Sequence, residues 1–572
     1  MDTKKRTTLL LILAIALFML WDNWQVYRGG TSMIFQHEAK KTDSNAGLPE
    51  VPIETAVPAE NETATPVAAA AETAKTVQEK QAELVTITTD VLKARVTSDG
   101  GVFQYLELLH YPDTVDPEKD MVLFDMAPPR VYLAQTGLTG GAYPNHATRF
   151  TIRPGKRSLA EGENELKLVM DAEQNGVRLT KTYTFKRGSY IVDIDQKVTN
   201  LGSEPIDASL YFQLLRDSSK PEGQSRFIST FTGPAVYTEE DKFQKLKFDD
   251  ITETRGASHA TDTDNGWIAM VQHYFVSAFI PGEQVKRENY TKKVGEDLYA
   301  IGTVVPLGML APKASASNDT RLYVGPQESV ILEQTAPGLE LVKDYGWLTI
   351  IAKPIFWLMT HIHKEVGNWG WTIILLTCLI KLIFLPLSAA SYKSMARMKQ
   401  FTPRIQQLRE RYKDDKQRMN QELMALYKAE KINPLGGCLP VVVQIPVFIS
   451  LYWVLLASVE IRNAPWLGWI QNLAAPDPYF ILPVVMAGSM FLMQKMSPPP
   501  PDPLQAKLMM FLPIVFSITF FFFPSGLVLY WLVNNLLSIA QQYWINKRYG
   551  KAPTKKAACF PEFPRKARAC RG

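Results

Sequence analysis

Residues 508–546 read LMMFLPIVFSITFFFFPSGLVLYWLVNNLLSIAQQYWIN, which is 39 consecutive positions without Asp, Glu, Lys or Arg. The hydrocarbon core of a bilayer needs about 20 apolar residues per helix, so one straight helix of this length would be nearly twice too long. The tetrapeptide Phe523-Pro524-Ser525-Gly526 provides a turn, because proline and glycine interrupt helices. The stretch therefore predicts two membrane spans, 508–523 and 526–546.

Four further apolar stretches occur in the 572-residue chain. Residues 434–459 contain no charge in 26 positions, and residues 478–494 contain none in 17. Residues 366–392 contain one charge, Lys381, and predict a span over 366–390. With the N-terminal apolar run, the spans number six. Although only 46% of all residues are apolar, their clustering excludes a purely soluble protein.

The N-terminal run, residues 7–21, follows Lys4, Lys5 and Arg6 and has the basic start and short apolar core of a signal peptide. No small-x-small cleavage site follows it. Trp21 and Trp24 are typical of the membrane interface, so we predict an uncleaved signal anchor over residues 1–24, with a cleaved signal peptide as the alternative.

Basic residues predict the orientation. Four segments, 1–6, 391–433, 495–507 and 546–572, together carry a net charge of +17, whereas the rest of the chain carries −12. Cytoplasmic loops are enriched in Lys and Arg. A cytoplasmic N-terminus and six spans place all four segments in the cytoplasm, so we expect a multi-pass protein with both termini cytoplasmic and a large polar domain outside.

The polar part begins with residues 25–83, whose Ala-, Glu-, Thr- and Pro-rich composition predicts a disordered linker. From residue 84 the apolar residues alternate with period two, and Asn175-Gly176 separates two such runs, which is a strong hairpin signal. Residues 84–340 contain no cysteine, so disulfides cannot stabilise them. We expect an antiparallel β-sandwich held together by burial alone.

Between this domain and the first internal span, residues 341–365 predict an amphipathic helix at the membrane interface, with Leu348, Ile351 and Ile355 on its apolar face. Residues 391–433 have apolar residues at helical spacing on both sides of Asp414-Asp415, which predicts a cytoplasmic helical hairpin. A cytoplasmic loop, 495–507, and a basic cytoplasmic tail, 547–572, complete the expected organisation.

Lys381 is the main candidate functional residue, because a charge near the middle of a span costs at least ~2.5–3.5 kcal/mol and requires polar surroundings. Thr377 lies one helical turn before it, and Ser388 two turns after it. Polar residues of other spans include Gln444, Asn534, Asn535 and Ser538. We expect a hydrated cationic cavity. A lysine that reaches the interface or a helix carbonyl is the alternative.

Motifs of catalysis are absent from the sequence. It has no P-loop, no Gly-x-Ser-x-Gly, no His-Glu-x-x-His and no cysteine pair at metal spacing. His361 and His363 do not converge on a helix, because they are two residues apart. We therefore expect no enzyme activity, no catalytic residues, no cofactor and no metal.

The basic tail offers a binding surface for phosphate groups. Lys547, Arg548, Lys551, Lys555 and Lys556 could contact ribosomal RNA or anionic lipids, whereas the alternative is that they only fix the topology. We expect no DNA partner.

Several motifs resemble the YidC/Oxa family of bacterial membrane protein insertases, in its long Gram-negative form. They are Asn433-Pro434-Leu435-Gly436-Gly437-Cys438-Leu439-Pro440, Gln444-Ile445-Pro446-Val447-Phe448, Asp477-Pro478-Tyr479, Gln494-Lys495-Met496-Ser497-Pro498 and Phe523-Pro524-Ser525-Gly526-Leu527-Val528-Leu529-Tyr530-Trp531. The resemblance implies an insertase and chaperone of the inner membrane that inserts, folds and assembles integral membrane proteins, alone or with the Sec translocon. It also implies a periplasmic β-supersandwich.

The resemblance further implies a hydrophilic groove whose basic residue, usually Arg, corresponds to Lys381. Lysine keeps the charge but lacks the planar fork of donors. Positions that contact the substrate would correspond to Ile445, Phe448 and Trp531. The implied partners are nascent membrane proteins, the Sec translocon with its accessory subunits, and the ribosome.

Two other classes of protein remain as alternatives. A small-molecule transporter would use Lys381 as its substrate site. A membrane-anchored carbohydrate-binding or enzymatic module would need converging carboxylates or histidines in the polar domain, and it would not need six spans.

Overall fold

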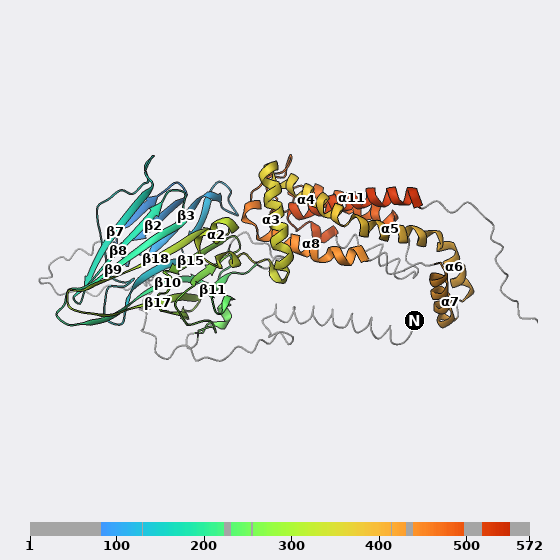
Figure 1. The fold of residues 1–572 in the computed structure, drawn as a ribbon. Helices are drawn as coiled ribbons and strands as arrows, with labels where there is room; N and C mark the ends of the chain where they lie inside the picture. Colours follow the sequence, from blue (N-terminus) through green and yellow to red (C-terminus); the bar gives the residue numbers. More distant parts are fainter. Residues whose placement is uncertain are drawn as a thin grey trace, which may run out of the picture. The chain divides into compact units, whose positions relative to one another are not determined.

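The computed structural model describes residues 82–127, 130–221, 230–252, 256–412, 415–430, 439–496 and 517–549. They divide into two compact units. We call residues 82–344 with 457–460 the sandwich unit, and residues 345–456 with 461–549 the helical unit (Figure 1). The expected anchor, nearly all of the linker, most of the expected span 508–523 and the tail beyond residue 549 lie outside the described residues.

The sandwich unit contains two nine-stranded antiparallel sheets (Figure 1). The first sheet has the order β1 (Leu84–Thr88), β2 (Leu92–Thr97), β3 (Phe103–Pro112), β5 (Tyr132–Thr139), β10 (Ile206–Asp217), β17 (Leu298–Leu310), β16 (Arg287–Gly295), β13 (Asp262–Thr263), with β4 (Asp120–Phe124) paired to β3. The second has the order β12 (Lys242–Lys245), β11 (Gly233–Thr238), β14 (Trp267–Val271), β15 (Phe275–Pro281), β18 (Ser315–Pro326), β9 (Ile191–Asn200), β8 (Val177–Lys186), β7 (Glu165–Gln174), β6 (Thr151–Ile152).

The hairpin between β7 and β8 shows how the sequence specifies these sheets. Asn175 and Gly176 have φ angles of 51° and 73°, which a two-residue type I′ turn requires. In β8, alternate residues from Val177 to Phe185 are buried and the residues between them are more exposed. This alternation is the pattern of a strand with one face on a core. The predicted hairpin and the predicted antiparallel sandwich are both confirmed.

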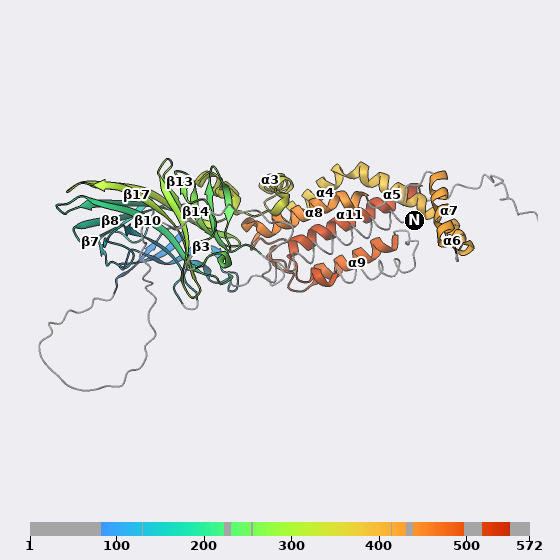
Figure 2. The same cartoon turned by 90° about the horizontal axis from the view of Figure 1, so that it is seen from below.

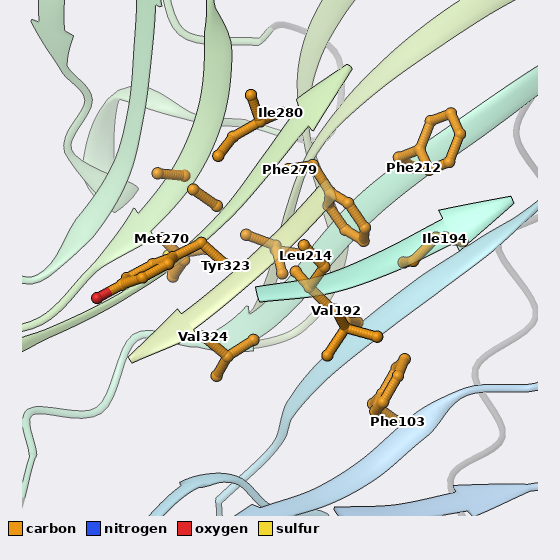
Figure 3. Packing of buried hydrophobic residues seen from close by; sticks show 14 of the residues in the cluster. Phe103, Val192, Ile194, Phe212, Leu214, Met270, Phe279, Ile280, Tyr323 and Val324 are labelled. Atoms are coloured by element: carbon orange, nitrogen blue, oxygen red, sulfur yellow. The ribbon is translucent and has the colours of Figure 1, made fainter. Parts of the chain in front are cut away.

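The core of the sandwich unit lies between the two sheets (Figure 3). Phe212 of the first sheet packs against Phe279 of the second with ring centroids 5.7 Å apart, and both side chains are fully buried. Phe103 and Tyr183 meet edge-on at 5.0 Å. Because residues 84–340 contain no cysteine, burial of these side chains is the main source of stability for the unit.

Gly266, just before β14, allows a test of this packing. It has a φ of +84°, and a Cβ there would lie 1.9 Å from the carbonyl oxygen of Tyr237. Gly162 has the same φ, but nothing lies within 4 Å of its Cβ position. We expect Gly162→Ala to cost about 1 kcal/mol from backbone strain alone, and Gly266→Ala to cost about 3 kcal/mol or more in unfolding free energy. Urea unfolding of both variants measures this; equal losses would contradict it.

The helices follow the sandwich strands along the chain. They are α2 (Ser329–Thr335) in the sandwich unit, then α3 (Thr349–Val366), α4 (Trp369–Ile383), α5 (Leu385–Gln400), α6 (Thr402–Arg411), α7 (Lys416–Ala429), α8 (Leu439–Ala457), α9 (Ile481–Met496) and α11 (Ser525–Tyr549). In the helical unit, α11 packs against α4, α5 and α9, and Figure 2 shows α8, α9 and α11 running alongside one another.

The predicted span 366–390 is not one helix. α4 and α5 meet at Phe384 with a bend of 67°. Pro386 explains the break, because proline has no backbone N–H to donate and its ring clashes with the carbonyl one turn earlier. Ser388 therefore does not lie two turns after Lys381 along a straight helix.

In the described part of the chain, no single helix has both the length and the hydropathy of a membrane span. The bent pair α4–α5, taken together, has the length and the apolar composition of one span. The apolar helices α8, α9 and α11 lie within or close to the predicted intervals 434–459, 478–494 and 526–546. The number of spans stays a prediction.

Two other predicted helical elements have observed counterparts. In α3 the buried residues are Ala352, Ile355, Phe356 and Met359, and Ile351 is half-buried. That this helix lies at the membrane interface stays a prediction. α6 and α7 pack together, and Arg404 at the start of α6 pairs with Glu430 just after α7 at 3.3 Å. This pairing of opposite ends indicates an antiparallel helical hairpin.

Candidate functional site

Lys381 lies in the last turn of α4, and its side chain is buried, with 8% of the residue exposed. Its Nζ donates a hydrogen bond to Ser538 Oγ of α11 at 2.8 Å. Ser538 Oγ donates in turn to the carbonyl of Asn534 at 2.7 Å. Among the described residues no carboxylate forms an ion pair with Lys381. Among the described residues, the hydrogen-bond partner of this buried lysine is therefore a hydroxyl and not a carboxylate.

The polar residues predicted around Lys381 have different roles. Thr377 is 1% exposed, but its hydroxyl donates to the carbonyl of Ile373 in its own helix. Asn534 contributes its carbonyl to the Ser538 contact. Gln444 is half-buried on α8 and makes no hydrogen bond with Lys381. Of the predicted polar residues that the structure describes, Ser538 thus bonds the lysine directly, and Asn534 is linked to it through Ser538.

Asn535 joins a second polar contact that the sequence did not reveal. It is 1% exposed, and its Nδ2 donates to Ser489 Oγ of α9 at 3.1 Å. Ser489 Oγ donates to the carbonyl of Met486. A lone serine in an apolar helix is a weak signal, because serine often bonds within its own helix. Consecutive residues of α11 thus take part in two contacts. Asn534 accepts a hydrogen bond from Ser538, which bonds Lys381 of α4, and Asn535 donates to Ser489 of α9.

The residues predicted to contact substrate form an apolar group. Phe448 of α8 meets Trp531 of α11 edge-on, with ring centroids 4.3 Å apart, and Phe520 lies 5.2 Å from Trp531. Ile445 lies three residues before Phe448 on α8 and is 47% exposed. The structure therefore brings Phe448 and Trp531 into contact and leaves Ile445 open.

Of the predicted basic contacts, Lys547 and Arg548 are exposed in the last turn of α11. The guanidinium of Arg548 lies over the ring of Trp544, 5.4 Å from its centroid. Lys551, Lys555 and Lys556 lie outside the described residues.

Comparison with known proteins supplies the family. Residues 84–358 match the family described as YidC periplasmic domain, and residues 361–552 match the family described as 60Kd inner membrane protein. The "Membrane protein insertase YidC" of Janthinobacterium sp. (strain Marseille) is 55% identical over 561 residues, which cover 96% of this chain and 99% of the relative. The chain belongs to the YidC family of membrane protein insertases.

A second relative agrees with this assignment. The YidC insertase of Cupriavidus metallidurans is 53% identical over 557 residues, covering 97% of this chain and 99% of the relative. A solved structure titled "Active YidC insertase crystal structure with the first transmembrane domain resolved" is 17% identical, covers 82% of this chain and 93% of that chain, and has a TM-score of 0.38. Membership of the YidC family makes this an inner membrane protein with a periplasmic domain, which contains the β-sandwich.

Proposed function

We propose that the chain inserts, folds and assembles membrane proteins along a path lined by α4, α8 and α11. The observation that carries this is Lys381, a buried cation whose described hydrogen bond is to Ser538 and which has no described carboxylate partner. Such a cation attracts an acidic segment and hydrogen-bonds a neutral polar one. Its hydroxyl partner can be exchanged for a substrate group, since no ion pair with a described residue has to be broken.

The apolar part of a substrate would follow a different surface. Ile445 is exposed, and Phe448 and Trp531 form an aromatic wall beside it. We infer that a hydrophobic segment slides along these residues into lipid, while its polar flank contacts Lys381. Partition of apolar surface from water into lipid drives release, so no nucleotide is required. Thr377, Gln444, Asn534 and Asn535 would keep the surroundings of the path polar.

The expected topology and partners form part of this proposal. The distribution of Lys and Arg supports six spans with both termini in the cytoplasm. It also places the hairpin of α6 and α7 in the cytoplasm and α3 at the outer interface. Lys547 and Arg548, with Lys551, Lys555 and Lys556, would contact the ribosome or anionic lipids. Cooperation with the Sec translocon and its accessory subunits is supported only by the resemblance.

Site-directed photo-crosslinking tests the path. A photoreactive phenylalanine at Phe448 or at Trp531 is expected to crosslink to a ribosome-bound single-span nascent chain as its apolar segment emerges, and to lose the crosslink as the chain lengthens. Phe491 of α9, which is 60% exposed, is the control position for contact with any hydrophobic surface. Two results together would contradict the proposal and favour a transporter. They are the absence of crosslinks at Phe448 and Trp531, and normal insertion of the single-span substrate in cells depleted of this protein.

A further inference from the structure

A cavity of about 260 Å³ lies in the sandwich unit, against β5 of the first sheet. Leu133 and Gln135 of β5 line it. They lie on the face of the sheet that points away from the second sheet, because their neighbours Tyr132 and Ala134 belong to the core between the sheets. The cavity is therefore separate from that core.

Gln135 is the polar residue of this cavity that lacks a partner. Only 3% of it is exposed, and its Oε1 accepts a hydrogen bond from Nε2 of Gln213 at 2.6 Å. Its Nε2 has no hydrogen-bond partner among the described residues and is not sealed from solvent. Because the side chain lines the cavity, the partner of this N–H group has to lie inside the cavity.

The amide of Gln135 is held in place by a row of residues across the sheet. The strand register aligns Gln135, Gln213, Gly302 and Tyr290 on β5, β10, β17 and β16. The hydroxyl of Tyr290 donates to Oε1 of Gln213 at 2.7 Å, and burial raises the pKa of Tyr290, so it keeps this proton. A Cβ at Gly302 would lie 2.3 Å from the Tyr290 ring, so only glycine leaves room for the phenol. Buried hydrogen bonds of this kind preorganise a binding group.

A second tyrosine orients His146, which also lines the cavity. The hydroxyl of Tyr211 accepts from the backbone N–H of His146 at 3.1 Å and lies 2.5 Å from its Nδ1. Burial raises the pKa of Tyr211, so the hydroxyl keeps its proton and donates it to Nδ1. Nδ1 is then an acceptor, and the proton of the neutral imidazole is on Nε2. Two polar side chains of the cavity wall are therefore fixed by buried tyrosines.

The charges of the cavity restrict the kind of ligand. Asp99 is the formally charged residue of its described lining, and Arg149 pairs with both of its carboxylate oxygens, at 2.7 Å and 3.2 Å. An ionic ligand would have no free counter-charge there, which makes its burial costly. Val102, Met126 and Leu133 add apolar surface to the polar groups. The volume lies just below the range of about 300–1,000 Å³ that is typical of sites for drug-sized ligands.

We propose that this cavity binds a small uncharged polyol, about one sugar ring in size. One of its oxygens accepts a hydrogen bond from Nε2 of Gln135, and another of its hydroxyls donates to the carboxylate of Asp99. The C–H groups of the ring pack against Val102 and Leu133. The site belongs to the periplasmic domain, and its test does not depend on insertase activity.

Saturation-transfer NMR titration of the full-length protein tests the ligand class. The protein is placed in nanodiscs prepared without glycoside detergents, because their sugar headgroups would compete. The probes are D-glucose, D-galactose and myo-inositol, and we expect at least one to bind with a Kd of about 1 mM or tighter. D-Glucuronate, which carries a charge, and cyclohexanol, which has a single hydroxyl, should bind at least about tenfold more weakly than the best probe.

Two results of this titration would overturn the proposal. The first is the absence of binding by all three uncharged probes. The second is binding of D-glucuronate or of cyclohexanol as tight as that of the best probe, since it would show that the cavity does not select an uncharged polyol.

Variants test the location. Gln135→Met is expected to weaken binding of the best probe at least about tenfold, because it removes the N–H donor. Gln196→Met is the matched control, since Gln196 is also buried, at 0% exposed, and does not line the cavity. Leu84 lines the cavity but is 50% exposed, so Leu84→Trp should fold, fill part of the cavity and weaken binding at least about threefold. Unchanged binding in folded Leu84→Trp would contradict the location even if Gln135→Met fails to fold.

Discussion

The unfolding free energy of the β-sandwich is expected to rise between about pH 7 and about pH 10, and to lose most of this rise in Lys181→Met. Lys181 of β8 is fully buried between the sheets. Its Nζ donates to the carbonyls of Gly100 at 2.6 Å and Thr136 at 2.7 Å, and it lies 4.6 Å from the ring centroid of Phe150. Burial lowers the pKa of Lys181 from 10.5 to about 7, and no described carboxylate pairs with its ammonium group.

The sign follows from proton binding. In the unfolded chain Lys181 keeps its proton up to about pH 10.5, whereas in the folded protein it loses the proton above about pH 7. Between these values the unfolded state binds more protons, so raising the pH favours the folded state. The gap between 10.5 and about 7, at ~1.36 kcal/mol per pH unit, amounts to about 5 kcal/mol. Below about pH 7 the full cost of burying the charge is present.

Pulse proteolysis after urea unfolding of the intact purified protein measures this difference. Comparing each variant with the wild type at the same pH cancels the titration of other groups. Lys197→Met is the control, since Lys197 is an exposed lysine on the neighbouring strand β9. Methionine leaves two carbonyls without a donor, so the variant gains less than the full amount at pH 7. An identical pH slope in the wild type and Lys181→Met would contradict the prediction.

Lys181 also shows what the sequence can and cannot predict about the sandwich. Alternation in β8 places Val177, Leu179, Lys181, Tyr183 and Phe185 on one face, and all five are buried. The period therefore predicts the inward position of the lysine. It does not predict the carbonyls that receive it, because Gly100 and Thr136 come from other parts of the chain. The order of the strands in each sheet cannot be predicted from the sequence either, because pairing between strands that are distant in the chain leaves no local sequence pattern.

In the helical unit, apolar runs predict the helices but not their mutual rotation. Thr377, Gln444, Asn534, Asn535 and Ser538 were all candidates to surround Lys381, and the direct hydrogen bond goes to Ser538. Choosing among them requires knowing how α4 faces α11, which depends on packing over the whole interface. The break between α4 and α5 has a local cause, because Pro386 cannot continue the helix, so this part of the structure is predictable from the sequence.

Replacement of the Lys381 charge is expected to have the largest effect on function. We expect Lys381→Met to slow insertion of a substrate with an acidic translocated tail by roughly ten- to a hundredfold. The estimate takes a charge pair about 6–12 Å apart at an effective dielectric constant of ~20, which is worth about 1.4–2.8 kcal/mol. A substrate with a neutral tail should be affected much less, because it loses a hydrogen-bond donor but no charge attraction.

Two further variants separate charge from structure. Lys381→Arg keeps the charge and should retain insertion of the acidic tail. Ser538→Ala removes the described hydrogen-bond partner of Nζ but leaves the ammonium group, so it should also retain it. If Ser538 instead only anchors Lys381 to hold α4 against α11, then Ser538→Ala and Lys381→Met should lower the stability of the helical unit alike.

Insertion rates of the paired substrates, normalised to the amount of folded protein, decide between these roles. If the role of Lys381 is electrostatic, Lys381→Met slows insertion of the substrate with the acidic tail more than that of the substrate with the neutral tail. Lys381→Arg then leaves the insertion rate of the acidic-tail substrate unchanged. Equal slowing of both tails would contradict that role. A cation whose described contact is a hydroxyl, and which no described carboxylate neutralises, is otherwise an unexplained cost to the stability of the bundle.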